Sequence, residues 1–370
     1  MSGWNRWEAV NRPTAIAVLA LLLGAILYGL ADFVGAAPQP RVEIAGPSDM
    51  HAEDMIGDHA LYAKIAGRVS AGEPYYSAAA AEHRANGYPL KPFVTVRLPT
   101  AAYIFALFGR TGGWLLVAAV GVAAILAWRK RLISEPGLPG YARFAALLMA
   151  PNMAPILMRD WVMIHEVLAG ALIALAFALY RPERPWAALL TILAAILVRE
   201  TALPVAIIFG CFALYDRRWP ELLAWTGAGA VLLAAVGLHA STLSAVLRPD
   251  DLASPGWSGM GGWHTYVAFV HQVSALRFLP SCISAILVPI ALLGWSACRS
   301  RLALVVLSFQ FALALILMAF ARANNFYWAC LVVPTLHMGL IFAPAAIKNL
   351  VRACAPRFSK DHLERALIRP

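Results

Sequence analysis

The sequence predicts an all-α membrane protein, a polytopic transmembrane helix bundle. Three observations support this: 61% of the 370 residues are hydrophobic, only 14% are charged, and the mean hydropathy is +0.68. Soluble domains carry roughly 25% charged residues. A chain this apolar needs lipid as its solvent, where backbone polar groups are satisfied only in helices or closed barrels. The long apolar runs show no two-residue alternation, so they indicate helices.

About ten apolar runs are candidate spans, because a membrane helix needs roughly 20 mostly apolar residues and fewer where it is buried among others. The runs cover 14–34, 113–128, 141–158, 164–180, 186–198, 201–215, 221–240, 279–297, 302–320 and 328–347. Lys and Arg cluster beside every second crossing and at both ends of the chain. Since cytoplasmic loops are enriched in these residues, we expect both termini in the cytoplasm. The Ala-rich composition and short loops favour a bacterial inner-membrane protein, with 1–370 forming a single integral domain.

This topology holds only if the short apolar stretch from Leu98 to Phe108 does not cross the membrane. The stretch is opened by Arg97 and closed by a Gly-rich segment, 109–113. A crossing here would place the basic cluster 129–131 outside. Its length and this penalty predict an interfacial or re-entrant helix.

The threading leaves three segments outside the spans. They are a first extracytoplasmic loop, 35–112, a second extracytoplasmic loop, 241–278, and a basic cytoplasmic tail, 348–370. The formal net charge of +10 arises from clusters at the ends of apolar runs, as topology signals do. We therefore expect the lipid bilayer, and no nucleic acid, as a partner.

The first loop contains a short amphipathic helix preceded by carboxylates. From Asp58 onward, the spacing of apolar residues places Leu61, Tyr62 and Ile65 on one face, and Gly72 ends the helix. Asp58 follows Asp54 by four residues. One interpretation makes Asp58 an N-cap and its neighbours solvated first-turn acids. The other makes one carboxylate a general base facing a hydroxyl acceptor.

Aromatic and basic side chains are interleaved through the rest of the first loop. They are Tyr75, Tyr76, His83, Arg84, Lys91 and Arg97. Such a mixture suits a sugar and a phosphate headgroup. It equally suits an aromatic belt with anchoring cations at the membrane surface.

The order of these features resembles the GT-C superfamily of integral membrane glycosyltransferases, which includes aminoarabinose transferases and protein O-mannosyltransferases. The stretch GDHALYAKIAGRVSAGEPYY, which follows the first span, is similar to the family's first-loop pattern. YPLKPFVTVRLPTAAYIFALFG resembles its Pro-rich juxtamembrane helix. The resemblance of order covers residues 1 to about 215.

The resemblance implies inverting transfer of a sugar from a polyprenyl-phosphate carrier to a glycan, lipid or protein acceptor at the outer membrane face. A first-loop carboxylate would be the base, and Asp58 matches by position. Many relatives carry an Asp-Glu pair, whereas the adjacent pair here is Glu53-Asp54. The choice between Asp54 and Asp58 therefore stays open.

Three outer turns and the second loop carry further candidates, because ionisable residues at the membrane edge are costly to bury. Glu166 lies where the family often has a second acid, and Arg199 where relatives place a cation near the lipid phosphate. The alternatives are an ion pair of Glu166 with Arg159 and a turn anchored by Arg199 and Glu200. The remaining candidates for substrate binding are Arg159, His165, Glu200, His264, Arg322, Asn325 and Tyr327.

Two other functions are compatible with the sequence. A transporter or lipid flippase would explain the many spans, although the charges lie mainly at membrane edges and no repeat is evident. A non-catalytic subunit of an envelope-assembly complex would use the acidic loop as a docking surface. No cofactor is implied with certainty. The acids could bind a divalent cation, but no ligand spacing demands one.

Overall fold

The computed structural model describes residues 3–35, 57–135 and 137–355. These residues form helices and connections, with no named strand among them, so the predicted all-α class is confirmed for this part of the chain. Four helices are long and apolar enough to cross a membrane. They are α1 (Arg12–Gly35), α4 (Thr100–Ser134), α10 (Trp219–Ser244) and α13 (Arg301–Phe320). Four shorter apolar helices accompany them: α7 (His165–Leu179), α8 (Trp186–Val198), α9 (Leu203–Tyr215) and α12 (Ser281–Ala297).

Short elements complete the described chain. The α-helical ones are α2 (Asp58–Ser70), α3 (Tyr75–Ala85), α5 (Met149–Asn152), α6 (Ala154–Leu157), α11 (Gly262–Val273), α14 (Val333–Leu336) and α15 (Ala343–Cys354). The 3-10 helices are η1 (Arg6–Ala9), η2 (Phe93–Thr95), η3 (Gly140–Leu148), η4 (Trp161–Met163), η5 (Glu200–Ala202), η6 (Ala275–Phe278), η7 (Ala323–Leu331) and η8 (His337–Ile341).

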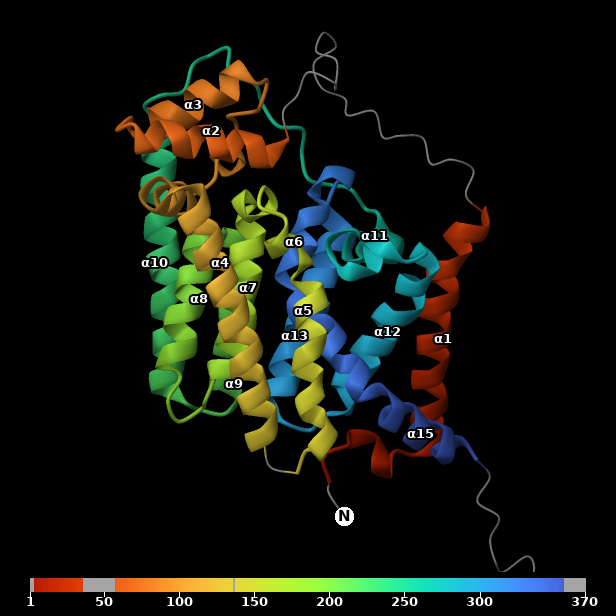
Figure 1. Ribbon diagram of the computed structural model, residues 1–370. Helices are drawn as coiled ribbons and strands as arrows, with labels where there is room; N and C mark the ends of the chain where they lie inside the picture. Colours follow the sequence, from red (N-terminus) through yellow and green to blue (C-terminus); the bar gives the residue numbers. More distant parts are fainter. Residues whose placement is uncertain (1–2, 36–56, 136, 356–370) are drawn as a thin grey trace, which may run out of the picture.

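The α4 helix contains the predicted boundary between a short helix and a span. Its residues run continuously from Thr100 to Ser134, but Gly109 has φ +66° and ψ 174°, which are not helical angles. Glycine tolerates this left-handed conformation because it has no Cβ. Within the stretch from Leu98 to Phe108, residues 100–108 thus form a separate helical piece, and the chain changes direction before the long part of α4 (Figure 1).

Two of the apolar runs form interrupted helices rather than single spans. The run 141–158 is divided into η3, α5 and α6, and the run 328–347 into η7, α14, η8 and part of α15. Pro155 and Pro334 lie at the first turns of α6 and α14, because proline lacks the N–H that a helix interior requires. Gly294 and Gly339 let α12 and η8 approach so closely that a Cβ on either would clash with the backbone of the other segment.

The second loop contains a helix that the sequence analysis did not predict. Helix α11 spans Gly262–Val273 and buries Tyr266, Val267 and Val270 in the main hydrophobic core. It packs beside α1, α12 and α13 (Figure 1). Residues 245–261 connect α10 to α11, so the predicted second loop, 241–278, contains this helix.

Helices α2 and α3 form a cap over one end of the bundle (Figure 1). The predicted apolar face of α2 is buried at Leu61 and Ile65, which pack with Tyr75 of α3 and Leu243 at the end of α10. The helix ends before Gly72, whose φ is +92°. Gly57 occupies the N-cap and Asp58 is the first residue of the helix. The N-cap interpretation of Asp58 is therefore wrong by one residue.

Candidate functional site

A cavity of about 560 Å³ lies where the cap meets the end of the bundle. Three separate segments form it: the cap region, the connection between α10 and α11, and η7. Its polar and aromatic lining consists of Asp58, Tyr62, His83, Tyr88, Thr95, Arg97, Ser254, Trp257, Arg322, Asn324, Asn325, Tyr327 and Trp328. Pockets for small molecules are typically 300–1,000 Å³, so this cavity can hold a sugar phosphate.

Asp58 is the only carboxylate among the described residues that line the cavity. It opens α2, where the helix dipole favours a negative charge. The hydroxyl of Tyr88 donates a hydrogen bond of 3.0 Å to Asp58 Oδ1. This bond orients the carboxylate while leaving it within the cavity wall.

Two guanidinium groups supply the positive charge of the cavity. Arg97 Nε donates to the Tyr62 hydroxyl oxygen over 3.1 Å. Arg322 Nη1 donates to the carbonyl of Pro255 over 3.2 Å, and its guanidinium lies 5.7 Å from the ring centroid of Trp257. Since a guanidinium has five donors, both groups retain capacity for phosphate oxygens.

Aromatic rings make up much of the remaining wall, from Tyr62 and Tyr88 to Trp257, Tyr327 and Trp328. Rings of this kind present an apolar face together with a polar edge, which suits a sugar. Burial raises the pKa of the Tyr62 and Tyr88 hydroxyls above the ordinary value. Both phenols therefore stay protonated near neutral pH.

The connection after α10 is fastened to the cap, which encloses the cavity from that side. Arg84 forms an ion pair with Asp251 through bonds of 2.6 and 2.9 Å, and this guanidinium holds the pKa of Asp251 down to about 2. The backbone N–H groups of Leu90 and Lys91 both donate to the carbonyl of Leu252. Lys91 Nζ also donates to the carbonyl of Pro249 over 2.9 Å. The side chains of Arg84 and Lys91 thus join two segments and lie outside the cavity lining.

Arg199 lies beneath the cavity and does not line it. Its Nε donates to Glu166 Oε1 over 2.5 Å, and it also pairs with Glu200. Arg199 and Glu166 are both only 1% exposed. The guanidinium lies 5.8 Å from the ring centroid of Trp328, which does line the cavity. Glu166 therefore pairs with Arg199, and the alternative pairing with Arg159 is wrong.

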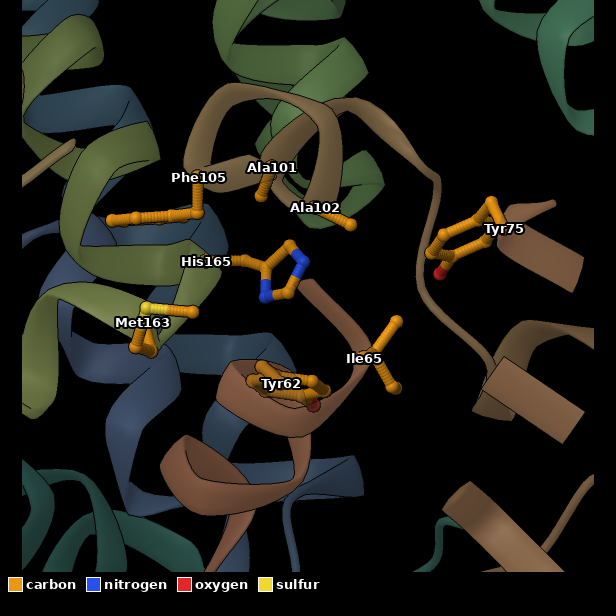
Figure 2. A pocket seen from close by; sticks show the side chains of 8 residues that line it. All are labelled: Tyr62, Ile65, Tyr75, Ala101, Ala102, Phe105, Met163 and His165. Atoms are coloured by element: carbon orange, nitrogen blue, oxygen red, sulfur yellow. The ribbon is translucent and has the colours of Figure 1, made fainter. Parts of the chain in front are cut away.

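His165 lies at the contact between the cap and the bundle. Figure 2 shows its imidazole beside Tyr62, with Ala102 and Phe105 also at this contact. The His165 and Tyr62 ring centroids are 4.6 Å apart. The void between these residues is about 10 Å³, the size of a single water. It is too small for a substrate, so His165 packs behind the cavity wall.

The remaining candidates lie elsewhere in the structure. Tyr75 donates to the carbonyl of Arg97 over 2.6 Å, and Tyr76 lies 3.3 Å from His239 Nδ1. Arg159 is exposed, with its guanidinium 5.5 Å from the Trp114 ring centroid. His264 belongs to α11 and does not line the cavity. Asp54 lies outside the described residues.

Sequence reasoning overlooked three aromatic side chains of the lining, Tyr88, Trp257 and Trp328, as site residues. Each is an aromatic in a segment that already contained a candidate, next to Pro89, Gly256 and Tyr327 respectively. Proximity along the chain was the available signal. It could not distinguish them from membrane-interface aromatics.

The described residues offer no metal-binding cluster. No group of three His, Cys, Asp or Glu side chains among residues 57–135 and 137–355 is arranged to hold an ion. Asp58 is a single carboxylate in a cavity that already carries two guanidiniums, which disfavour a cation electrostatically. The described site therefore does not fit the divalent cation considered from the sequence.

No protein-family model, curated protein or solved structure matches this chain.

Proposed function

We propose that this protein is an inverting glycosyltransferase that moves a sugar from a polyprenyl-phosphate-linked donor to a hydroxyl acceptor. The observation that carries the proposal is the cavity in which Asp58 lies together with Arg97 and Arg322. The carboxylate can accept the proton of the acceptor hydroxyl, and the two guanidiniums can bind the phosphate that is released. The first-loop resemblance to GT-C enzymes supports the same assignment.

Asp58 is the general base in this mechanism. It accepts the proton of the acceptor hydroxyl while that oxygen attacks the anomeric carbon of the sugar. The bond between the anomeric carbon and the phosphate oxygen breaks on the opposite face, so the configuration inverts. The departing polyprenyl phosphate keeps the electron pair of that bond.

Arg97 and Arg322 stabilise the charge that develops on the leaving phosphate. Donors that are already in place are effective because they need little reorganisation during the reaction. The aromatic walls, including Trp257 and Trp328, position the sugar ring. Arg199 acts behind Trp328 by holding that part of the wall.

The proposed topology has about ten spans, with the interrupted helices counted among them. Both termini would be cytoplasmic, and the cap and cavity would face the extracytoplasmic side of a bacterial inner membrane. The first-loop helices, α2 and α3, would lie at the membrane surface as in GT-C enzymes. This arrangement would place the lipid-linked donor beside the cavity.

The test is a transfer assay with the purified full chain, polyprenyl-phosphate sugars and candidate hydroxyl acceptors. We expect wild type to transfer the sugar and Asp58→Asn to lose activity by about 100-fold or more, a usual size for a general base. Asp250→Asn is the matched control, because Asp250 is exposed and does not line the cavity. Full transfer by Asp58→Asn would refute the site. Failure of wild type to bind or use any lipid-linked donor would refute the function.

A further inference from the structure

A groove of about 480 Å³ lies between α9 and α13. It lies beside the last turns of α9 and the first turns of α13, and these helix ends lie opposite the cap (Figure 1). Its apolar walls come from both helices and consist of Ile208, Cys211, Phe212, Tyr215 and Leu304. The groove opens on the outer surface of the bundle, since Cys211 is exposed and Tyr215 is 79% exposed. In a membrane this surface faces lipid, so the groove is shaped for a hydrocarbon chain.

Arg301 lies at one end of this groove, at the first residue of α13. Its guanidinium lies 4.8 Å from the Phe212 ring centroid and 5.5 Å from that of Tyr215. The charge therefore lies against the two rings that form the groove wall. A cation fixed at the apolar edge of a membrane helix lies where lipid phosphates are found.

The carboxylate beside Arg301 is shared with another cation. Arg301 pairs with Asp216, and Arg218 Nη2 also lies 3.6 Å from Asp216. Arg218 in turn pairs with Glu221 over 2.8 Å. Arg217 is exposed on the same turn. Three guanidiniums are thus grouped with two carboxylates, which leaves one positive charge to be neutralised.

We propose that this groove binds an anionic phospholipid, with an acyl chain between α9 and α13 and the phosphate on Arg301. A phosphodiester carries a single negative charge, which would neutralise the one excess positive charge of this group of side chains. A zwitterionic phospholipid brings its own ammonium group toward Arg217 and Arg218, which repel it. Each basic residue near a membrane surface favours an anionic lipid by about fivefold.

The site is separate from the proposed sugar-transfer cavity. The cavity lies under the cap, whereas Arg301 begins α13 at the other end of the bundle (Figure 1). Lipid binding here therefore does not depend on the proposed function. Its measurement needs no sugar donor.

The experiment is native mass spectrometry of the full chain in detergent, titrated with phosphatidylglycerol or with phosphatidylcholine of identical acyl chains. Wild type should retain one phosphatidylglycerol at a concentration at least fivefold below that needed for phosphatidylcholine. Arg301→Ala should abolish this preference, and Arg301→Lys should keep part of it. Arg143→Ala is the matched control, since Arg143 lies 5.0 Å from the Phe144 ring centroid but does not line the groove.

A second variant keeps the ion pair of Arg301 with Asp216 intact. Cys211→Trp fills the groove and should abolish lipid retention even if Arg301→Ala fails to fold. Glycerol phosphate, which has the headgroup without the chains, should not displace the bound lipid. Equal retention of the two lipids by wild type would overturn the proposal, as would unchanged preference in Cys211→Trp. If glycerol phosphate displaced the lipid at concentrations similar to those at which the lipid binds, the proposal that an acyl chain occupies the groove would be wrong.

Discussion

Tyr88 donates a hydrogen bond of 3.0 Å to Asp58, joining two segments that lie 30 residues apart in the chain. The bond fixes the carboxylate at the start of α2 relative to the cavity wall. Tyr88 itself lies in that wall. We regard the Tyr88 hydroxyl as a positioning group because it bonds the carboxylate of Asp58, while the ring forms part of the wall.

Replacing Tyr88 by Phe removes the hydroxyl and keeps the ring. Because a hydrogen bond to a charged group contributes about 1.5–3 kcal/mol, we expect kcat to fall by roughly 10-fold or more. The KM for the lipid-linked donor should change little, since the two guanidiniums remain. Steady-state kinetics of sugar transfer measure both quantities. A larger effect on KM than on kcat would mean that Tyr88 binds the donor directly.

Alanine substitutions of Arg199 and Arg322 should distinguish an arginine that stabilises the fold from one that binds substrate. Arg199→Ala leaves Glu166 buried without its cation, and breaking a buried pair in this way costs about 3–5 kcal/mol. Arg322→Ala removes a cavity cation whose guanidinium bonds the carbonyl of Pro255, and it should leave the folded state within about 1 kcal/mol of wild type. Melting curves in detergent should show a large loss only for Arg199→Ala.

Binding of the lipid-linked donor is the second measurement that distinguishes Arg322 from Arg199. Arg322→Ala should weaken binding of a polyprenyl phosphate by about 10-fold, a reduction typical of one charge-assisted contact. If Arg199→Ala instead folded normally and lost donor binding, the assignment of Arg199 to the supporting layer would be wrong. Arg322→Lys should restore part of the affinity because it retains the charge.

The ion pair between Arg84 and Asp251 should couple the cap to the connection after α10. The Asp251 side chain is only 2% exposed, so we expect a double-mutant cycle with Ala to give a coupling of about 1–3 kcal/mol. Arg68 and Glu73 are the control pair, at 2.6 Å but with side chains 41% and 29% exposed. Their coupling should be the smaller of the two, because solvent screens an exposed pair. Equal couplings would show that burial does not strengthen the Arg84 pair.

The stability of the cap should fall in mild acid because of His83. This side chain is 3% exposed, its Nδ1 lies 2.9 Å from the carbonyl of Pro89, and burial lowers its pKa to about 4. The unfolded chain takes up a proton near pH 6.5 and the folded chain only near pH 4. The contribution of His83 is therefore present above pH 6.5 and is lost as the pH falls toward 4.

At pH 5 this difference amounts to about 2 kcal/mol relative to pH 7, from the two pKa values. Thermal unfolding of wild type and His83→Gln at the two pH values isolates it, since all other titrating groups are shared. The wild-type loss should exceed that of the variant. Parallel pH profiles would show that His83 is protonated equally in both states.

The sequence predicted the helical membrane class because composition and run length depend on the solvent rather than on tertiary contacts. It also located the break near Gly109, where a Gly-rich segment followed a short apolar stretch. It did not predict α11, since Gly256 to Gly262 suggested an irregular loop and the core residue Tyr266 lies in a short helix. The interruption of the run 328–347 was also not predicted, although Pro334 marks one of its breaks.

The site could be predicted only in part because it is assembled from distant segments. Asp58, Arg97 and Arg322 were candidates from their chemistry, and the cavity brings them together. Arg199 was an equally good candidate by chemistry, yet the structure places it behind Trp328 with two carboxylates. Local sequence cannot distinguish a cation that faces a cavity from one that supports its wall.

The central claim is that the cavity containing Asp58 binds the phosphate and sugar of a lipid-linked donor. Electron cryomicroscopy of the full chain with a non-transferable polyprenyl-phosphate sugar analogue tests it most directly. We predict density for the phosphate within hydrogen-bond distance of Arg97 or Arg322, with the anomeric carbon facing Asp58. Density for the analogue outside this cavity, or a phosphate bound by Arg199, would contradict the claim.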